Sequence, residues 1–205
     1  MKLSQRNLIF GGMLLLALWF MRDWMEARMA RHMLLQMPAL AWCGWLMHGA
    51  LAADDQSRLN PWNRHGLTGF LLILLLAAFW MVPLALDLAL VSPIMLVIKI
   101  TGWITAGFWL RQSMQQSHIA VQFFMLGNFV MMTAAVSDIY EHAPNRLCNA
   151  YGQNDQVVTA QGLLWMAITI STAWVVNVWR SWHPYVLNNH TEIALSASVA
   201  SERKT

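Results

Sequence analysis

Methionine recurs at every fourth position near the start of the chain, and a histidine and a glutamine lie among these methionines. If the segment is one α-helix, five side chains share a stripe about 80° wide, with Met33 at its edge. They are Met21, Met25, Met29, His32 and Gln36. Cu(I) prefers thioether and imidazole ligands, and neither adds a charge to be buried. Methionine also fills irregular gaps between packed helices. The stripe therefore predicts either a Cu(I) site at Met25, Met29, His32 and Met33 or a packing face.

A second polar segment follows further along the chain, and it contains several side chains that could bind a metal. His142 and Cys148 are six residues apart, which matches no standard zinc spacing. Asp155 opens the next helix, and we expect it beside His32 as a fourth ligand or as a group that orients a ligand. Because Cys43 should lie deep inside a predicted membrane span, we expect no disulfide between it and Cys148.

Composition indicates which kind of fold holds these segments. Of the 205 residues, 58% are hydrophobic and only 11% are charged, whereas about 25% are charged in an average soluble domain. These values exclude a soluble globular domain and a disordered chain, and two cysteines exclude a disulfide scaffold. The net charge of +3 gives no reason to expect a nucleic-acid partner. We expect an all-α, polytopic integral membrane bundle with the lipid bilayer as its surroundings.

About six stretches are long and apolar enough to be transmembrane helices. We expect residues 1–182 to form this helical domain and residues 183–205 to form a flexible cytoplasmic tail. The first stretch lacks a small-residue cleavage site, so we interpret it as an uncleaved span continued by residues 21–31. The six predicted spans are Leu8–Phe20, His32–Ala53, Leu67–Val91, Pro93–Leu110, His118–Ser137 and Val158–Trp179.

The distribution of Lys and Arg predicts the orientation of the bundle. With six spans and a cytoplasmic N-terminus, eight of these residues lie inside and four outside, so we expect both termini in the cytoplasm. The inner residues are Lys2, Arg6, Arg58, Arg64, Arg111, Arg180, Arg203 and Lys204, and the outer ones are Arg22, Arg28, Arg31 and Arg146.

Two charged residues, Asp87 and Lys99, lie within the apolar spans on either side of Ser92 and Pro93. At 1.5 Å per residue, both should lie roughly 8–9 Å from this turn on neighbouring antiparallel helices. Because an unpaired charge in a membrane is costly, we predict an Asp87–Lys99 ion pair that clamps the two helices. A proton or ion relay is the alternative.

The remaining motifs limit the possible chemistry. His48 and His118 should lie near the cytoplasmic side at similar depth, which leaves open a b-type haem or quinone-binding protein. The sequence contains no nucleophile–base constellation, phosphate-binding glycine loop or H-E-x-x-H motif. We therefore expect that the protein is not an enzyme.

Two segments together resemble the CtaG-like cytochrome c oxidase assembly proteins. The run from Arg28 through His32 and Met33 resembles the family's His-Met-x-x-His-Met signature, with Pro38 following as in the family. Asp155-Gln156, followed by Gly162 and Trp165, resembles the family's Asp-Gln…Gly…Trp segment. Arg28 stands where the family has its first histidine, and the family typically has seven spans.

The resemblance implies a multi-pass protein of the inner (plasma) membrane that handles copper. Its partner would be a terminal oxidase or another cuproprotein subunit, to which it delivers or positions Cu(I). The metal site would use His32 with Met25 or Met29 in place of the missing histidine, and Asp155 nearby. Two alternatives remain: a non-catalytic subunit of a larger membrane complex, and a haem- or quinone-binding protein.

Overall fold

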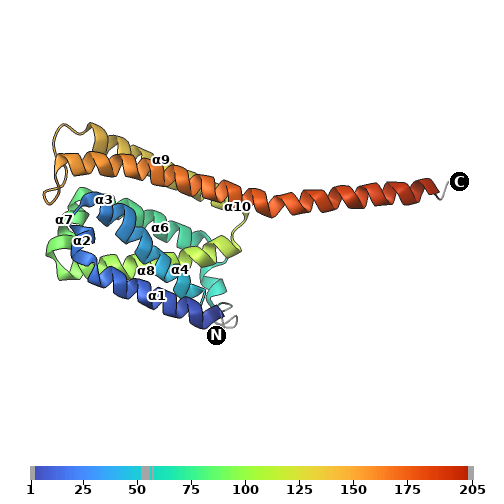
Figure 1. Ribbon diagram of the computed structural model, residues 1–205, viewed down its shortest axis with the longest axis horizontal. Coiled ribbons are helices and arrows are strands. Elements are labelled where there is room, and N and C mark those ends of the chain that lie inside the picture. The colour runs from blue at the N-terminus through green and yellow to red at the C-terminus, as the bar shows by residue number, and fades with distance from the viewer. Residues whose placement is uncertain (1–2, 52–55, 57, 203–205) are drawn as a thin grey trace. The chain divides into compact units, whose positions relative to one another are not determined.

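The computed structural model describes residues 3–51, 56 and 58–202, and the side chains of residues 5–51, 56 and 58–180. Every regular element in these residues is a helix, so the predicted all-α fold is confirmed. The chain divides into two units, Met1–Ala167 and Ile168–Thr205, and the site lies in the first. The elements are α1 (Leu3–Phe20), α2 (Arg22–Glu26), α3 (Met29–Arg31), η1 (His32–Gln36), α4 (Met37–His48), η2 (Asn60–Asn63), α6 (Leu67–Trp80), α7 (Pro83–Val91), α8 (Pro93–Gln116), α9 (Ile119–His142) and α10 (Gln153–Glu202) (Figure 1).

Three helices are long and apolar enough to cross a membrane, namely α8, α9 and the Gln153–Arg180 part of α10. The pair α6 and α7 passes the same test together, but the two helices are bent by 81°. The span predicted over Leu67–Val91 therefore consists of two helices with a sharp bend between them, and whether the pair crosses the membrane stays a prediction. Val82 is extended, and Pro83 begins α7, as expected because a proline disfavours helical geometry in the residue before it. The structure thus has three candidate spans, or four with the bent pair.

The N-terminal methionine segment is not one continuous helix. The α-helix is interrupted at Arg28, which is extended (φ −136°, ψ 138°), and again at η1, which is a π-helix. Met21 is exposed, whereas Met29 and Met33 are buried in the hydrophobic core. The single stripe predicted from a regular α-helix is therefore wrong, because two breaks change the directions of its side chains.

Helices α4 and α8 run in parallel and pack very closely. A Cβ atom on Gly44 would collide with the backbone at Ile104 and Phe108, and one on Gly107 would collide with the backbone at Ala41. Small residues allow this close approach of two helix backbones, as is common between membrane helices. The backbones of α4 and α8 are therefore in direct contact, with Lys99 towards one end of the pair and His48 towards the other.

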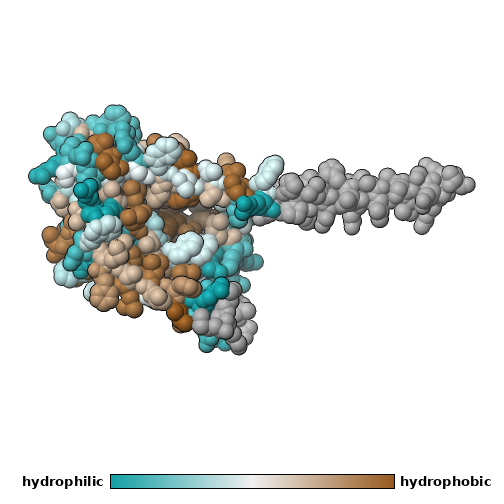
Figure 2. All heavy atoms as spheres, in the orientation of Figure 1, coloured by the Kyte–Doolittle hydropathy of each residue, from teal (hydrophilic) through white to brown (hydrophobic). Residues whose placement is uncertain are grey.

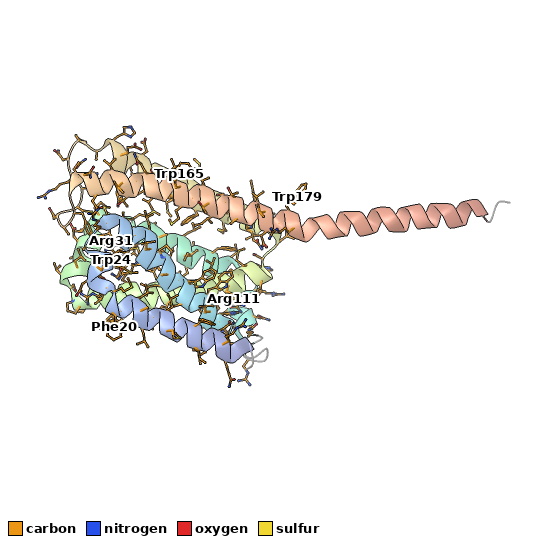
Figure 3. All side chains as sticks on the ribbon, viewed as in Figure 1. Phe20, Trp24, Arg31, Arg111, Trp165 and Trp179 are labelled. Atoms are coloured by element: carbon orange, nitrogen blue, oxygen red, sulfur yellow. The ribbon has the colours of Figure 1, made fainter. Side chains whose placement is uncertain are left out.

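Surface hydropathy matches this arrangement. Figure 2 shows mainly hydrophobic residues over the middle of the first unit and hydrophilic residues towards its two ends. Arg31 lies at one end, where its guanidinium carbon is 4.1 Å from the centre of the Trp24 ring, and Arg111 lies at the other (Figure 3). We call these the Arg31 end and the Arg111 end.

The second unit contains the rest of α10, which continues to Glu202. The predicted flexible tail begins within this helix, and its last residues, 203–205, lie outside the described part. The boundary at residue 182 and the mobility of the tail stay predictions.

Candidate functional site

A buried ammonium group organises the Arg31 end. Lys99 on α8 has no exposed surface. Its Nζ donates to Glu26 Oε1 at 2.6 Å and to Gln36 Oε1 at 3.0 Å, and it lies 2.9 Å from His32 Nε2. These three acceptors use all three hydrogens of an ammonium group. We call Glu26, His32, Gln36, Lys99 and Tyr151 the Lys99 centre.

Glu26 supplies the negative charge that balances Lys99. Its side chain is 6% exposed, and it also accepts hydrogen bonds from Gln36 Nε2 at 3.2 Å and from Arg22 Nε at 3.0 Å. Because a buried ion pair is favourable only when its other hydrogen-bonding groups are satisfied, these additional bonds matter. The pair is thus held by contacts from α2, η1 and α8.

The π-helix explains how two residues of one element reach the same ammonium. In η1, the Met37 N–H bonds to His32 O, five residues earlier. This wider turn brings side chains four residues apart closer to one line than an α-helix does. His32 and Gln36 therefore both face Lys99, and π-helical turns are often found at functional sites.

The ring of His32 connects this ion pair to the loop before α10. An ammonium can only donate, so Nε2 of His32 must be the acceptor and Nδ1 must carry the hydrogen. Nδ1 donates to Tyr151 Oη at 2.8 Å, and Tyr151 Oη donates to Glu26 O at 3.0 Å. Burial, together with the nearby charge of Glu26, raises the pKa of the Tyr151 phenol. The phenol therefore stays protonated at neutral pH and acts as this donor.

Asp155 lies where the sequence analysis expects it, beside the methionine–histidine segment. Its Oδ2 accepts a hydrogen bond from Met29 N at 2.5 Å. Arg28 is extended and its side chain provides no cap, so the first N–H of the short helix α3 would otherwise lack a partner. Asp155 thus caps α3 from a position 126 residues away.

The predicted Asp87–Lys99 ion pair is wrong. Asp87 accepts hydrogen bonds from Asn149 N at 2.8 Å and from Ala150 N at 3.1 Å, whereas Lys99 pairs with Glu26. The prediction used only the depth of each residue from the turn. It could not determine the direction of either side chain around its helix.

The loop 143–152 is fixed to the bundle by further bonds. Gln156 accepts from Leu147 N at 2.8 Å and donates to Tyr140 O at 2.9 Å. Cys148 is buried against Pro83 O. Its burial, together with the charge of Asp87, raises the pKa of the thiol to about 12. Cys148 is therefore a neutral thiol at physiological pH and a poor metal ligand, because metals bind the thiolate.

Cys43 and Cys148 are both buried free cysteines. His142 and Asp138 form an exposed ion pair on α9. They are separate from the Lys99 centre, and so they do not add ligands to it.

The predicted copper ligands do not form an open metal site in this structure. Both nitrogens of His32 are in hydrogen bonds, one of them to an ammonium. Met29 and Met33 are 0% and 4% exposed and belong to the hydrophobic core, while Met25 packs at its edge. Among the described residues, no three His, Cys, Asp or Glu side chains group as they would around a metal ion. These donors, as they lie here, do not fit a copper ion.

The Arg111 end contains a buried histidine in a different situation. His48 is fully buried, and neither of its ring nitrogens has a hydrogen-bond partner among the described residues. Its ring meets the Phe108 ring edge-on, with centroids 4.9 Å apart. His118 is exposed, and its Nδ1 accepts from Ala120 N at the start of α9. A haem between His48 and His118 stays a prediction.

Sequence reasoning missed two partners of Lys99 and one of His32. Gln36 lies on the predicted stripe but was given no role, and Glu26 and Tyr151 were not singled out. A usable signal existed for Glu26, because a lysine inside an apolar span requires a carboxylate at matching depth. Asp87 also met that condition, so depth alone could not distinguish the two.

Comparison with protein-family models, curated proteins and solved structures gave no match to this chain.

Proposed function

We propose that the chain is a multi-spanning inner-membrane protein that assists the assembly of a terminal oxidase or another cuproprotein. The supporting observation is that the two segments that carry the resemblance meet in space. Asp155 bonds to Met29 N, and Tyr151 bonds to the ring of His32. Residues separated by 119 and 126 positions therefore contribute to one polar centre at one end of the bundle.

The proposed role of copper concerns His32, Met25, Met29 and Met33, with Asp155 beside them. In the described conformation both ring nitrogens of His32 are already in hydrogen bonds. We therefore assign no copper coordination to this conformation. The test is the copper content of purified protein after incubation with Cu(I), together with a visible spectrum to detect haem. We expect about one Cu(I) per chain in the wild type, and little in a His32→Ala, Met29→Ala double variant.

Equal copper in the two proteins would reject this assignment, and so would its absence from both. Tyr140→Phe is the matched control, because the Tyr140 hydroxyl donates to Met81 O in the same unit and not to any of the proposed ligands. It should retain the copper content of the wild type.

A second candidate function is an accessory subunit of a larger membrane complex. The observation in its favour is that Met29 and Met33 are packed in the core and that Lys99 has every hydrogen in use. Such groups stabilise a fold. This candidate predicts a stable complex with other membrane proteins and no bound copper.

The proposed topology has six spans with both termini in the cytoplasm. It rests on the count of Lys and Arg and on the position of the Arg111 end opposite the loop 143–152. Single cysteines at Trp62 and Asn149, both exposed, test it in a background without Cys43 and Cys148. A membrane-impermeant thiol reagent added outside should label position 149 and spare position 62. The reverse pattern would invert the topology.

A further inference from the structure

We infer that α9 is a dimerisation helix, and that Asn128 and Gly127 on its outer face contact the same residues of a second copy of this chain in the membrane. This contact requires that α9 crosses the membrane, as in the proposed function, and it does not require copper.

Asn128 lies near the middle of α9, which is the most apolar of the three candidate spans. It comes nine residues after Ile119 and fourteen before His142. At 1.5 Å per residue, it is therefore about 4 Å from the midpoint of the helix. Since the hydrocarbon core of a bilayer is about 30 Å thick, this amide lies close to the centre of the core.

The side chain of Asn128 faces away from the rest of the first unit. The packed side of α9 carries Ser137, which is buried and donates to Ala160 O at 2.8 Å. Ser137 is nine residues after Asn128, and at 100° per residue the two lie on opposite sides of the helix. Asn128 is exposed, and its neighbours Phe124 and Met131 are 64% and 72% exposed. We call the side with Phe124, Asn128 and Met131 the outer face of α9.

The Asn128 amide has more hydrogen-bonding capacity than its own helix satisfies. Among the described residues, its bond is from Nδ2 to Phe124 O at 2.8 Å. A second N–H and the side-chain oxygen remain, and lipid offers them no partner. Thr101 on α8 provides a contrast, because its hydroxyl is also exposed in a candidate span but donates to Val97 O at 2.7 Å. Asn128 therefore requires a donor and an acceptor from outside its own helix.

A second copy of the chain supplies both groups at the required depth. Two copies inserted in the same orientation are related by a two-fold axis along the membrane normal, so each residue on the axis meets its equivalent. An amide is self-complementary, because the N–H of each Asn128 can donate to the side-chain oxygen of the other. Asparagine side chains form such bonds between membrane helices. The chemistry and depth of Asn128 thus favour an identical helix as the partner.

Gly127 allows two such helices to come close together. A Cβ atom on Gly127 would have no atom of this chain within 4 Å, whereas one on Gly44 or Gly107 would collide with a neighbouring backbone. Glycine weakens the interior of a helix, and no contact within the chain requires it at this position. Small residues let the backbones of paired membrane helices approach each other. Gly127 therefore suits a contact with a second helix beside Asn128.

Association of the full-length chain in phosphatidylcholine vesicles provides the test. Copies that carry donor or acceptor dyes are reconstituted together at several protein-to-lipid ratios, and energy transfer gives the association constant. The variants are Asn128→Leu, Asn128→Gln and Gly127→Leu. Two matched controls make the same kinds of change on other helices. Thr101→Leu removes an exposed polar group from α8, and Gly12→Leu fills an equally open glycine on α1.

We expect the wild type to dimerise and Asn128→Leu to weaken the association at least threefold, because the bonds between the two amides are lost. Gly127→Leu should weaken it as well by separating the backbones, whereas Asn128→Gln keeps an amide and should retain most of it. Both controls should associate as the wild type does. A wild type that stays monomeric at every ratio would overturn the inference, and so would Asn128→Leu associating as tightly as the wild type.

Cysteine cross-linking tests the face itself. Met131→Cys on the outer face and Val97→Cys on α8, where the native side chains are 72% and 57% exposed, are compared in a background without Cys43 and Cys148. Mild oxidation in vesicles should give covalent dimers at position 131 and few at position 97, and Asn128→Leu should reduce the yield at 131. Equal yields at the two positions would reject the outer face as the interface.

Native membranes distinguish a second copy from another protein. If the outer face cross-links there to a different chain while the purified wild type stays monomeric in vesicles, the face belongs to that partner and the inference fails. Failure of the wild type to bind Cu(I) would reject the copper assignment alone, because none of these measurements involves copper.

Discussion

Lys99 and His48 are both fully buried, and they lie at opposite ends of the α4–α8 pair. Lys99 has three acceptors within 3.0 Å, whereas neither nitrogen of His48 has a partner among the described residues. A buried charge requires compensation, because burying it alone costs several kcal/mol. A neutral imidazole costs less, since it carries no charge to desolvate. Two equally buried polar residues can therefore differ in how much they contribute to the stability of the fold, because that contribution depends on their hydrogen-bond partners.

The largest effect is expected from breaking the Lys99–Glu26 pair. Glu26→Gln alone should lower the free energy of unfolding by about 3–5 kcal/mol, because it leaves the buried Lys99 ammonium without a counter-charge. Lys99→Met alone should lower it by less, because Glu26 keeps its ion pair with Arg22. The double variant should recover much of this loss. Thermal or denaturant unfolding in detergent measures all three, and additive losses in the double variant would contradict the pairing.

A smaller effect is expected at Asp87. Asp87→Asn weakens two bonds from the loop to a charged acceptor, each worth about 1.5–3 kcal/mol at most. We expect faster hydrogen exchange at Asn149 and Ala150 and little change within α4. Combined with Lys99→Met, the losses should add, since the two residues have no common partner. Coupling between them would instead support the ion pair predicted from sequence.

The next prediction concerns the Tyr151 hydroxyl, which bonds to the His32 ring in the Lys99 centre. Tyr151→Phe leaves the Nδ1 hydrogen of His32 without its acceptor and should cost about 1–3 kcal/mol. Tyr140→Phe serves as a control for the loss of a buried hydroxyl, because Tyr140 donates to Met81 O. Unfolding of the two variants is compared, and only Tyr151→Phe should alter the ¹⁵N chemical shifts of the His32 ring.

The smallest effect is expected at His48. His48→Phe should change the free energy of unfolding by less than about 1 kcal/mol or increase it slightly, since no hydrogen bond is lost. His32→Phe is the matched control and should be strongly destabilising. A loss at His48 as large as at His32 would mean that His48 has a partner, and the contrast between the two ends would fail.

The sequence predicted an all-helical fold because long apolar runs between short polar segments are typical of membrane-spanning helices. The number of six spans and the orientation stay predictions. The sequence also predicted that Asp155 would lie beside the methionine–histidine segment, since both belong to one end of a bundle whose spans alternate in direction. It could not predict the partner of Lys99. Depth along a helix follows from counting residues, but direction around it depends on where helices break. The break at Arg28 contains neither glycine nor proline and carries no strong sequence signal. The break in η1 is followed by Pro38, whose missing N–H cannot bond to Leu34 O.

The π-helix has a consequence for how this sequence can change over generations. A π-turn accommodates one residue more than an α-helical turn of the same length. Deleting one residue between His32 and Gln36 could therefore restore a regular α-helix while α2 and α3 keep their direction relative to α4. The Glu26–Lys99 ion pair would then stay in place. Single-residue deletions should therefore be tolerated in this turn more often than in the regular α-helices, where each would rotate the flanking segments by about 100°.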